Sequence, residues 1–525
     1  MRPIKFLLAI AILPSATAAA QFAPEAYSFY TIQGQDTLAI EQVIRTDDQV
    51  DVDMLVRQQD VRFKFTLELG PDATVRRVTN RFFRQPQDEE PTQIVTAAFR
   101  GDSVDVEISG NRSQTMTVGT LPGALPWIRP SHALLEQALR RSKSLSGTVD
   151  SIAFFNIANG QTALATVAWE APETATIQFA EATISAEISE RGAVRGLQFR
   201  GEGIRVVRED AFKRLPIEKV DYGAPEGAPY RAEEVTVRTP AGLSLSGTLT
   251  FPDPANGKVP GVVTITGSGQ QDRDERLPGV GEYRPFWEIA DTLARVGIAT
   301  LRLDDRGINS SDPGPADATF LDFTEDIRAA LDYLRSRPEI DGERLALVGH
   351  SQGGLIAPRI AAADSMLAGI VLLAAPGYVG RRVLEAQRWA DLNPQYVQEH
   401  ERAEVVERSR RVDAGRAERA PNLRTLMEYD PLPAARRVRV PVLILQGDTD
   451  RQVTPEQADT LARAIRSAGN PDVSVQHFPG VNHLLLRDPE GWSSGYASLP
   501  EKEISREILG TIADWLADHL ERADG

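Results

Sequence analysis

One stretch, residues 345–354, constrains the fold more than any other part of the chain: Leu-Ala-Leu-Val-Gly-His-Ser-Gln-Gly-Gly. An apolar run breaks into glycines around a single serine, and small residues follow in the segment 355–363. This order predicts a buried strand, a sharp turn at Ser351 and a helix. A strained turn requires small neighbours two positions away, and Gly349 and Gly353 meet that requirement. Ser351 would then stand at a helix N-terminus, where unpaired N–H groups favour negative charge on a reacting oxygen.

The composition limits the kind of protein. At 525 residues the chain is too long for one ordinary core, and 42% apolar with 25% charged residues is typical of a globular protein. The net charge of −16 argues against nucleic acid or an anionic membrane surface as a partner, because either would need a basic face. The absence of cysteine excludes disulfides and a thiol nucleophile.

The first twenty residues have the pattern of a signal peptide. Arg2 and Lys5 form a basic region, residues 6–13 are apolar, and small residues at 16–20 suit a cleavage site. The apolar run is shorter than the roughly 20 residues that span a bilayer, which disfavours the alternative of a membrane anchor. We therefore expect an exported protein, in a bacterial periplasm or outside the cell, with no stable membrane insertion.

Residues 21–208 predict an antiparallel β-rich domain. Apolar residues alternate with polar ones, as in the segments 50–56 and 61–69, which is typical of a sheet with one solvated face. One helix is expected to begin after Ser131 as its N-cap. The domain shows no motif that carries chemistry, so its role is substrate access, a partner surface or, as the favoured interpretation, support. A segment rich in proline and glycine, residues 209–230, follows as a linker.

Residues 231–525 alternate between strand and helix patterns, which predicts an α/β domain with a doubly wound, mostly parallel sheet. Ligands of such sheets bind beyond the carboxyl ends of the strands. Between about residues 377 and 433 the alternation gives way to helical, arginine-rich sequence, which we interpret as a cap over that end of the sheet. Its charges are expected to form a solvated face, with contact between an arginine and the substrate as the alternative.

Two aspartates follow the strand at 442–445 and are candidates for the acid of a catalytic triad. Asp450 is favoured and Asp448 is the alternative, since either can orient an imidazole. A purely structural role, capping the turn, is less favoured because Thr454 is placed to cap the next helix.

His483 is the favoured base, because it lies in a loop after the last predicted strand. His477, inside that strand, is the competing candidate. The side chain of His350 is expected to point away from Ser351. Three further histidines are placed on helices expected at the surface: His132, His400 and His519.

A glycine-containing loop, residues 264–274, follows another strand. Its Ser268 or Gly269 is expected to supply one N–H donor to an oxyanion hole, and Gln352 the other. The alternative is a flexible loop whose charged residues form surface pairs: Asp272, Arg273 and Asp274. A dinucleotide site is excluded, since no Gly-x-Gly-x-x-Gly opens the following helix.

From about residue 231 onward the chain resembles the α/β-hydrolase superfamily. The resemblance rests on four segments: 267–274, 349–353, 447–450 and 480–483. Within the superfamily it is similar to secreted bacterial esterases related to dienelactone hydrolases, and to serine peptidases of the prolyl-oligopeptidase and aminopeptidase kind. The loop at 267–274 lacks the His-Gly-Gly-Gly form of many lipases, so a true lipase is disfavoured.

The resemblance implies a serine hydrolase, of carboxylesterase type, that uses Ser351, Asp450 and His483 and needs no cofactor or metal. Its substrate would be a small ester or a short peptide. Aminopeptidase, acyl-peptidase and thioesterase activities use the same triad and stay open, and cap residues Glu401, Glu404 and Glu407 are candidate anchors for a peptide's amino group. A secreted binding protein with an inactive hydrolase domain is the alternative of another class.

Overall fold

The computed structural model describes residues 24–521, apart from these short segments: 34–35, 58–60, 85, 87, 111–112, 129, 146, 180–181, 190–191, 202, 213–214, 216–219, 253–256, 278–279, 281–282, 316, 393–397 and 419. The expected signal peptide, residues 1–20, lies outside the described residues. No helix in the described part is long and apolar enough to cross a membrane.

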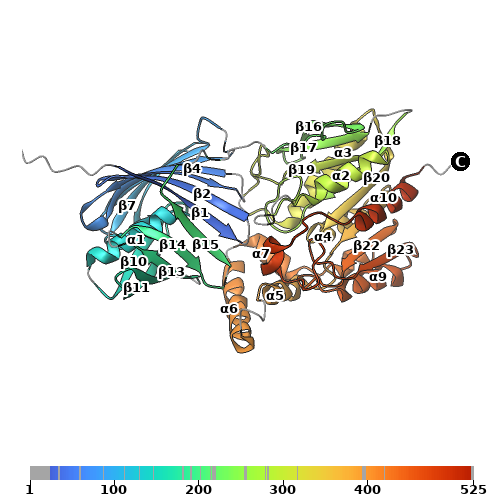
Figure 1. Cartoon of the computed structure of the whole chain (residues 1–525). Helices are drawn as coiled ribbons and strands as arrows, with labels where there is room; N and C mark the ends of the chain where they lie inside the picture. Colours follow the sequence, from blue (N-terminus) through green and yellow to red (C-terminus); the bar gives the residue numbers. More distant parts are fainter. Residues whose placement is uncertain are drawn as a thin grey trace, which may run out of the picture.

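A single curved sheet forms the N-terminal domain (blue to green in Figure 1). Within the described residues its spatial order is β8-β7-β6-β5-β4-β3-β2-β1-β15-β14-β13-β12-β11-β10-β9. Its neighbours pair antiparallel except for β9 and β10, which pair in parallel. The bounds are β1 (Glu25–Gln33), β2 (Asp36–Arg45), β3 (Gln49–Val56), β4 (Val61–Leu69), β5 (Val75–Phe83), β6 (Gln93–Arg100), β7 (Ser103–Gly110), β8 (Gln114–Gly119), β9 (Leu125–Trp127), β10 (Val149–Asn156), β11 (Thr162–Ala171), β12 (Thr174–Phe179), β13 (Ala182–Ile188), β14 (Val194–Phe199) and β15 (Ile204–Glu209).

Helix α1 (His132–Leu145) packs against the inner face of this sheet, and one hydrophobic core includes residues of both. The predicted N-cap is confirmed, since the Ser131 hydroxyl accepts a hydrogen bond from the Leu134 N–H at 3.3 Å. The expectation that His132 lies at the surface is wrong: its side chain is 3% exposed and its Nε2 lies 2.7 Å from the Thr31 hydroxyl. Because the sheet curves around α1, polar residues of the helix are enclosed as well as apolar ones.

An eight-stranded sheet organises the described part of the C-terminal domain, in the order β16-β17-β19-β18-β20-β21-β22-β23. The strands from β19 onward in this order are parallel, and β16 and β17 add an antiparallel edge. The strand bounds are β16 (Tyr230–Arg238), β17 (Ser244–Pro252), β18 (Val259–Ile265), β19 (Ala299–Leu303), β20 (Ile340–His350), β21 (Gly369–Leu373), β22 (Val442–Gly447) and β23 (Val473–Phe478).

Helices cover both faces of this sheet. On β20, Leu345 and Leu347 face one hydrophobic core, whereas Ala346 and Val348 face a second core. The first core includes α3 (Phe320–Ser336), α4 (Gly353–Ala361) and α9 (Glu456–Ser467), and the second includes α2 (Pro285–Arg295) and α10 (Arg506–Leu520). A strand buried on both faces reads as a continuous apolar run, which explains the pattern of the segment 345–348. The predicted doubly wound fold is therefore confirmed.

Four helices between β21 and β22 form the cap: α5 (Gly380–Ala390), α6 (Glu399–Ala417), α7 (Pro421–Glu428) and α8 (Leu432–Ala435). Figure 1 shows α5, α6 and α7 on the side of the C-terminal domain that is nearer the N-terminal domain. The exposed side chain of Arg410 pairs with Glu385 and Glu407, as expected for a solvated face.

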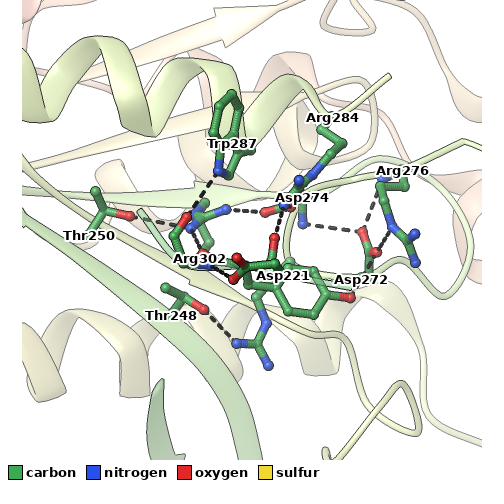
Figure 2. A network of polar contacts seen from close by, with 12 residues as sticks. Asp221, Thr248, Thr250, Asp272, Asp274, Arg276, Arg284, Trp287 and Arg302 are labelled. Atoms are coloured by element: carbon green, nitrogen blue, oxygen red, sulfur yellow. Dashed lines mark hydrogen bonds and ion pairs between the residues drawn. The ribbon is translucent and has the colours of Figure 1, made fainter. Parts of the chain in front are cut away.

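The connection between the domains is anchored to the C-terminal domain at residues 221–223. Arg302 donates to the carbonyl of Tyr222 at 3.0 Å, and Arg284 donates to the carbonyl of Asp221 at 2.7 Å. Figure 2 shows these contacts around a buried ion pair between Arg302 and Asp274. The segment predicted to be a linker is therefore held at one point by the arginines that pair with the buried Asp274.

Candidate active site

The predicted turn at Ser351 is present between β20 and α4. Ser351 has φ +50°, in the left-handed region that L-residues rarely adopt. A Cβ on Gly349 would lie 2.5 Å from the carbonyl oxygen of Gly353, and one on Gly353 would lie 2.2 Å from the carbonyl oxygen of Ile265. Both positions therefore require glycine, for the steric reason given by the sequence.

Three residues that are distant in the sequence meet above the carboxyl edge of the sheet. The Oγ of Ser351 lies 3.0 Å from Nε2 of His483, and Nδ1 of that imidazole lies 2.9 Å from Oδ2 of Asp450. All three side chains are buried. Ser351 follows β20, Asp450 follows β22 and His483 follows β23, so a parallel sheet brings their loops to one edge.

The carboxylate of Asp450 is held by its own loop. Its Oδ1 accepts the main-chain N–H groups of Gln452 and Val453, each at 2.9 Å, and its Oδ2 accepts the side-chain amide of Gln446 at 3.1 Å. Asp450 thus caps the turn and contacts His483 at the same time. The structural role and the contact with the imidazole, which the sequence analysis treated as alternatives, are therefore compatible. Thr454 does not cap α9 with its side chain: the N-cap position of the helix is Pro455, and the Thr454 hydroxyl donates to the Glu456 carboxylate at 2.6 Å.

The competing candidates form a separate pair. Nδ1 of His477 lies 3.0 Å from Oδ1 of Asp448, and both side chains are partly exposed. The imidazole of His477 is thus engaged with Asp448, whereas His483 is the one that contacts Ser351.

The loop after β18 brings Ser268 to the same site. The N–H groups of Ser268 and Gln352 donate to no acceptor in the described part of the chain, whereas the N–H of Gly267 donates to Oε1 of Glu275 at 2.7 Å. Ser268 lines the pocket beside Ser351, but Gly269 is not among the described residues that line it. Of the two alternatives for this donor, the pocket lining favours Ser268, whereas Gln352, which is also absent from the described lining, stays a prediction as the second donor.

The charged residues of this loop are buried, contrary to the alternative of surface pairs. Arg273 forms an ion pair with Asp304 at 2.7 Å, and Asp274 pairs with Arg302. Asp272 accepts a hydrogen bond from the hydroxyl of Tyr222 at 3.1 Å (Figure 2 shows its surroundings). Burial, the largest effect, raises the pKa of Asp274, and the two arginines beside it oppose that rise. These contacts fix the loop that carries Ser268.

His350 is a functional residue whose place the sequence analysis misjudged. Its side chain does not point away from the site: Nδ1 lies 2.8 Å from Oε1 of Glu275, and Nε2 lies 2.9 Å from the carbonyl oxygen of His483. Burial favours the neutral ring, but Glu275 and the carbonyl outweigh that effect and raise the pKa of His350. A carbonyl oxygen only accepts hydrogen bonds, so Nε2 carries a proton. The signal that sequence reasoning missed is Glu275, which lies within the run of charges at 272–276.

A pocket of about 230 Å³ opens beside Ser351, and we call it the Ser351 pocket. Its apolar lining comes from Leu277, Val280, Leu484 and Tyr496. Its neutral polar lining includes Gln33, Gln271, Gln387, Gln452, Ser493 and Ser494. Gln33 is the last residue of β1, so the N-terminal domain forms part of this pocket.

The described residues hold no group of three or more histidine, aspartate and glutamate side chains placed to bind a metal. The described lining of the pocket also excludes Glu404 and Glu407, both of which are exposed. The structure thus does not bring these two glutamates to the serine.

Comparison with known proteins points to one family. The sequence profile described as the alpha/beta hydrolase family matches residues 277–493. Esterase EstD of Thermotoga maritima is 27% identical over 356 residues, 65% of this chain and 78% of that protein. The uncharacterized peptidase YuxL of Bacillus subtilis is 24% identical over 296 residues, 55% of this chain and 39% of that protein.

Among solved structures, the esterase Pf2001 of Pyrococcus furiosus is similar with a TM-score of 0.41 and 17% identity, over 58% of this chain and 97% of that one. Est1E of Butyrivibrio proteoclasticus gives a TM-score of 0.37 and 18% identity, over 55% and 99%. The matched profile spans Ser351, Asp450 and His483, and the sheet order with its two helical layers agrees with it. The C-terminal domain thus has the α/β-hydrolase fold, and its residues 277–493 match the alpha/beta hydrolase family.

Proposed function

We propose that this protein is a serine hydrolase that cleaves carboxylic esters through an acyl-enzyme. The observation that supports the proposal is the continuous contact from Ser351 Oγ through His483 to Asp450, with 3.0 Å and 2.9 Å between the interacting atoms. The esterase EstD, similar over most of its own length, gives independent support for esters as the substrate class.

In the first half of the reaction, Nε2 of His483 takes the proton of Ser351 as Oγ bonds to the ester carbonyl carbon. The carbonyl π electrons move to oxygen, and the N–H groups of Gln352 and Ser268 stabilise that oxyanion. When the oxyanion collapses, the bond between carbon and the alcohol oxygen breaks. The departing alcohol takes the proton from His483, and the acyl group stays on Ser351.

In the second half, His483 removes a proton from water as the water oxygen attacks the acyl carbon. Collapse of the second oxyanion breaks the bond to Ser351 Oγ, which recovers the proton from His483. A free acid leaves, and every group of the enzyme returns to its starting state. Asp450 stabilises the imidazolium that forms in each half.

Substitution of the triad tests this function with a short-chain nitrophenyl ester. Ser351→Ala and His483→Ala should each lower kcat by roughly 10⁴ to 10⁶ fold, since the triad acts as a unit. His477→Ala is the matched control and should keep nearly full activity. A loss below tenfold for Ser351→Ala rejects the serine, and a greater loss for His477→Ala than for His483→Ala rejects the base.

Two further measurements separate the alternatives. An aminoacyl nitroanilide and an acyl thioester, assayed beside the ester, rank peptidase and thioesterase activity against esterase activity. A fluorophosphonate probe should label the wild-type protein at Ser351, and it should not label the Ser351→Ala variant. Absence of both turnover and labelling would favour a binding protein with an inactive domain.

A further inference from the structure

The neutral polar side chains of the Ser351 pocket come from separate parts of the chain. Gln33 ends β1 of the N-terminal domain, Gln387 lies on α5 of the cap, and Gln452 lies in the loop after β22, which also carries Asp450. Each is half-buried. An amide side chain both donates and accepts hydrogen bonds, as a hydroxyl group does. Amides that line one pocket therefore suit a ligand with several hydroxyl groups.

Part of this hydrogen-bonding capacity is open to a ligand. The amide nitrogen of Gln452 donates to the Tyr496 hydroxyl at 3.3 Å, and that of Gln271 donates to the Ser268 carbonyl at 3.1 Å. These bonds orient the two side chains and use one N–H of each, while the described contacts leave both amide oxygens as acceptors. Ser493 donates to Asp391 at 2.6 Å, so its oxygen also accepts.

The charges around the pocket disfavour a charged substrate. Among the described residues that line it there is no arginine or lysine to bind an anion. The carboxylate of Glu275 is the acidic group of that lining, and its Oε1 already lies 2.8 Å from the ring of His350 and 2.7 Å from the Gly267 nitrogen. Its Oε2 is buried and has no hydrogen-bond partner among the described residues, so a cationic substrate is the alternative that the charged esters below must test.

We propose that Gln33 and Gln387, with Gln271 and Gln452, form a subsite for a neutral polyhydroxylated group, so that the preferred substrates are acyl esters of sugars or similar polyols. The inference rests on the proposed ester hydrolysis and extends it to the group that carries the ester. It also assigns the N-terminal domain a direct role in substrate selection, through Gln33.

A matched pair of substrates tests the subsite. Methyl 6-O-acetyl-glucopyranoside and cyclohexylmethyl acetate place the same acetyl group on a six-membered ring with and without hydroxyl groups. For the wild-type protein, kcat/KM should favour the sugar ester at least about tenfold, since even one or two hydrogen bonds are worth that much. Equal or lower kcat/KM for the sugar ester overturns the proposal. Failure of both esters, with no fluorophosphonate labelling, rejects the hydrolase function instead.

Variants of the subsite identify the residues that produce the preference. Gln33→Leu and Gln387→Leu should each lower the ratio of kcat/KM for the sugar ester to kcat/KM for cyclohexylmethyl acetate about three- to tenfold, because leucine removes a hydrogen bond that only the sugar ester can make. Gln114→Leu, at an exposed position of β8 in the same domain as Gln33, is the control and should leave the ratio unchanged. An unchanged ratio in Gln33→Leu would remove the N-terminal domain from the subsite.

Charged acetate esters test the neutral character of the ligand. Acetylcholine carries a cation, and the acetate ester of glycolic acid carries an anion. Both should be turned over with lower kcat/KM than the sugar ester. A higher kcat/KM for either one would overturn the assignment of a neutral polyol, and would identify the sign of charge that the pocket prefers.

Discussion

His350 connects three loops of the active site without being one of the three reacting residues. Through Nδ1 it contacts Glu275, which also holds the N–H of Gly267, and through Nε2 it contacts the carbonyl of His483. Glu275 has φ +56°, a conformation that persists because these contacts fix it. One buried pair thus joins the loops that carry Ser268, Ser351 and His483.

Removal of the outer nitrogen of His350 should loosen the catalytic base. His350→Asn keeps a polar group near Glu275 but cannot reach the carbonyl of His483, so we expect kcat to fall roughly 10- to 100-fold with little change in KM. The rate of fluorophosphonate labelling should fall in parallel, while the Tm stays within a few degrees. His477→Asn is the control, and equal kcat for the two variants would contradict a positioning role.

The sequence was sufficient for residues whose place follows from the order of strands. Ser351, Asp450 and His483 each come directly after a parallel strand, and the edge of the sheet brings such residues together. His350 was misplaced because its orientation depends on the left-handed turn at Ser351 and on Glu275, 75 residues earlier in the chain. No sequence motif marks Gln33, because its place in the Ser351 pocket depends on how the two domains are arranged.

At the scale of elements, α1 shows how a helix can be held inside a curved sheet. The carboxylate of Glu41, on β2, accepts the N–H groups of His132 and Ala133 at 2.7 and 3.2 Å, and it also accepts the Ser131 hydroxyl. Burial raises the pKa of Glu41 to about 7, although these hydrogen bonds oppose the rise. The alternation of residues predicted the strands, but it did not reveal that one sheet curves around this helix. The sequence analysis predicted the N-cap Ser131, but the contacts of Glu41 with the helix N-terminus had no counterpart in it.

The N-terminal domain should lose stability as the pH rises through 7. The pKa of Glu41 is near 4.5 in the unfolded chain and about 7 in the folded one, so folding favours the protonated form. Its contribution is fully present below pH 4.5 and is lost between that pH and 7, a change on the order of 3 kcal/mol. Relative to the wild-type protein, Glu41→Gln should therefore have a more favourable free energy of unfolding at pH 8 than at pH 5. Calorimetry of the unfolding of the N-terminal domain measures this difference.

Glu107→Gln, at an exposed position of β7, is the control for this prediction. It should change the free energy of unfolding equally at the two pH values. The same result for Glu41→Gln would show that the carboxylate of Glu41 does not link stability to pH.

At the scale of the whole molecule, the two domains have separate hydrophobic cores. One core includes α1 and the curved sheet, and the other two lie on the faces of the eight-stranded sheet. Between the domains, Arg84 donates to the carbonyl of Ser311 at 3.5 Å, and Gln33 reaches the Ser351 pocket. We therefore expect calorimetry to show two unfolding transitions, because each domain can unfold with its own core.

Arg302→Met assigns one transition to the C-terminal domain. It removes one of the two arginines that pair with the buried Asp274 and leaves Arg284 at 2.6 Å, which should cost at most about 3–5 kcal/mol and lower the midpoint of that transition alone. Arg100→Met is the control, because Arg100 is largely exposed and should move neither midpoint. A single transition that shifts as a whole with Arg302→Met would contradict independent unfolding of the domains.

The position of Gln33 has a consequence for access to the serine. One wall of the Ser351 pocket belongs to the N-terminal domain, which has its own hydrophobic core. The width of the pocket entrance therefore depends on the angle between the two domains. A small tilt at their junction would admit or reject bulky molecules without any change in the reacting atoms. The anchor at residues 221–223 ties the connecting segment to the C-terminal domain, and we expect it to limit such a tilt and with it the size of the molecules that enter.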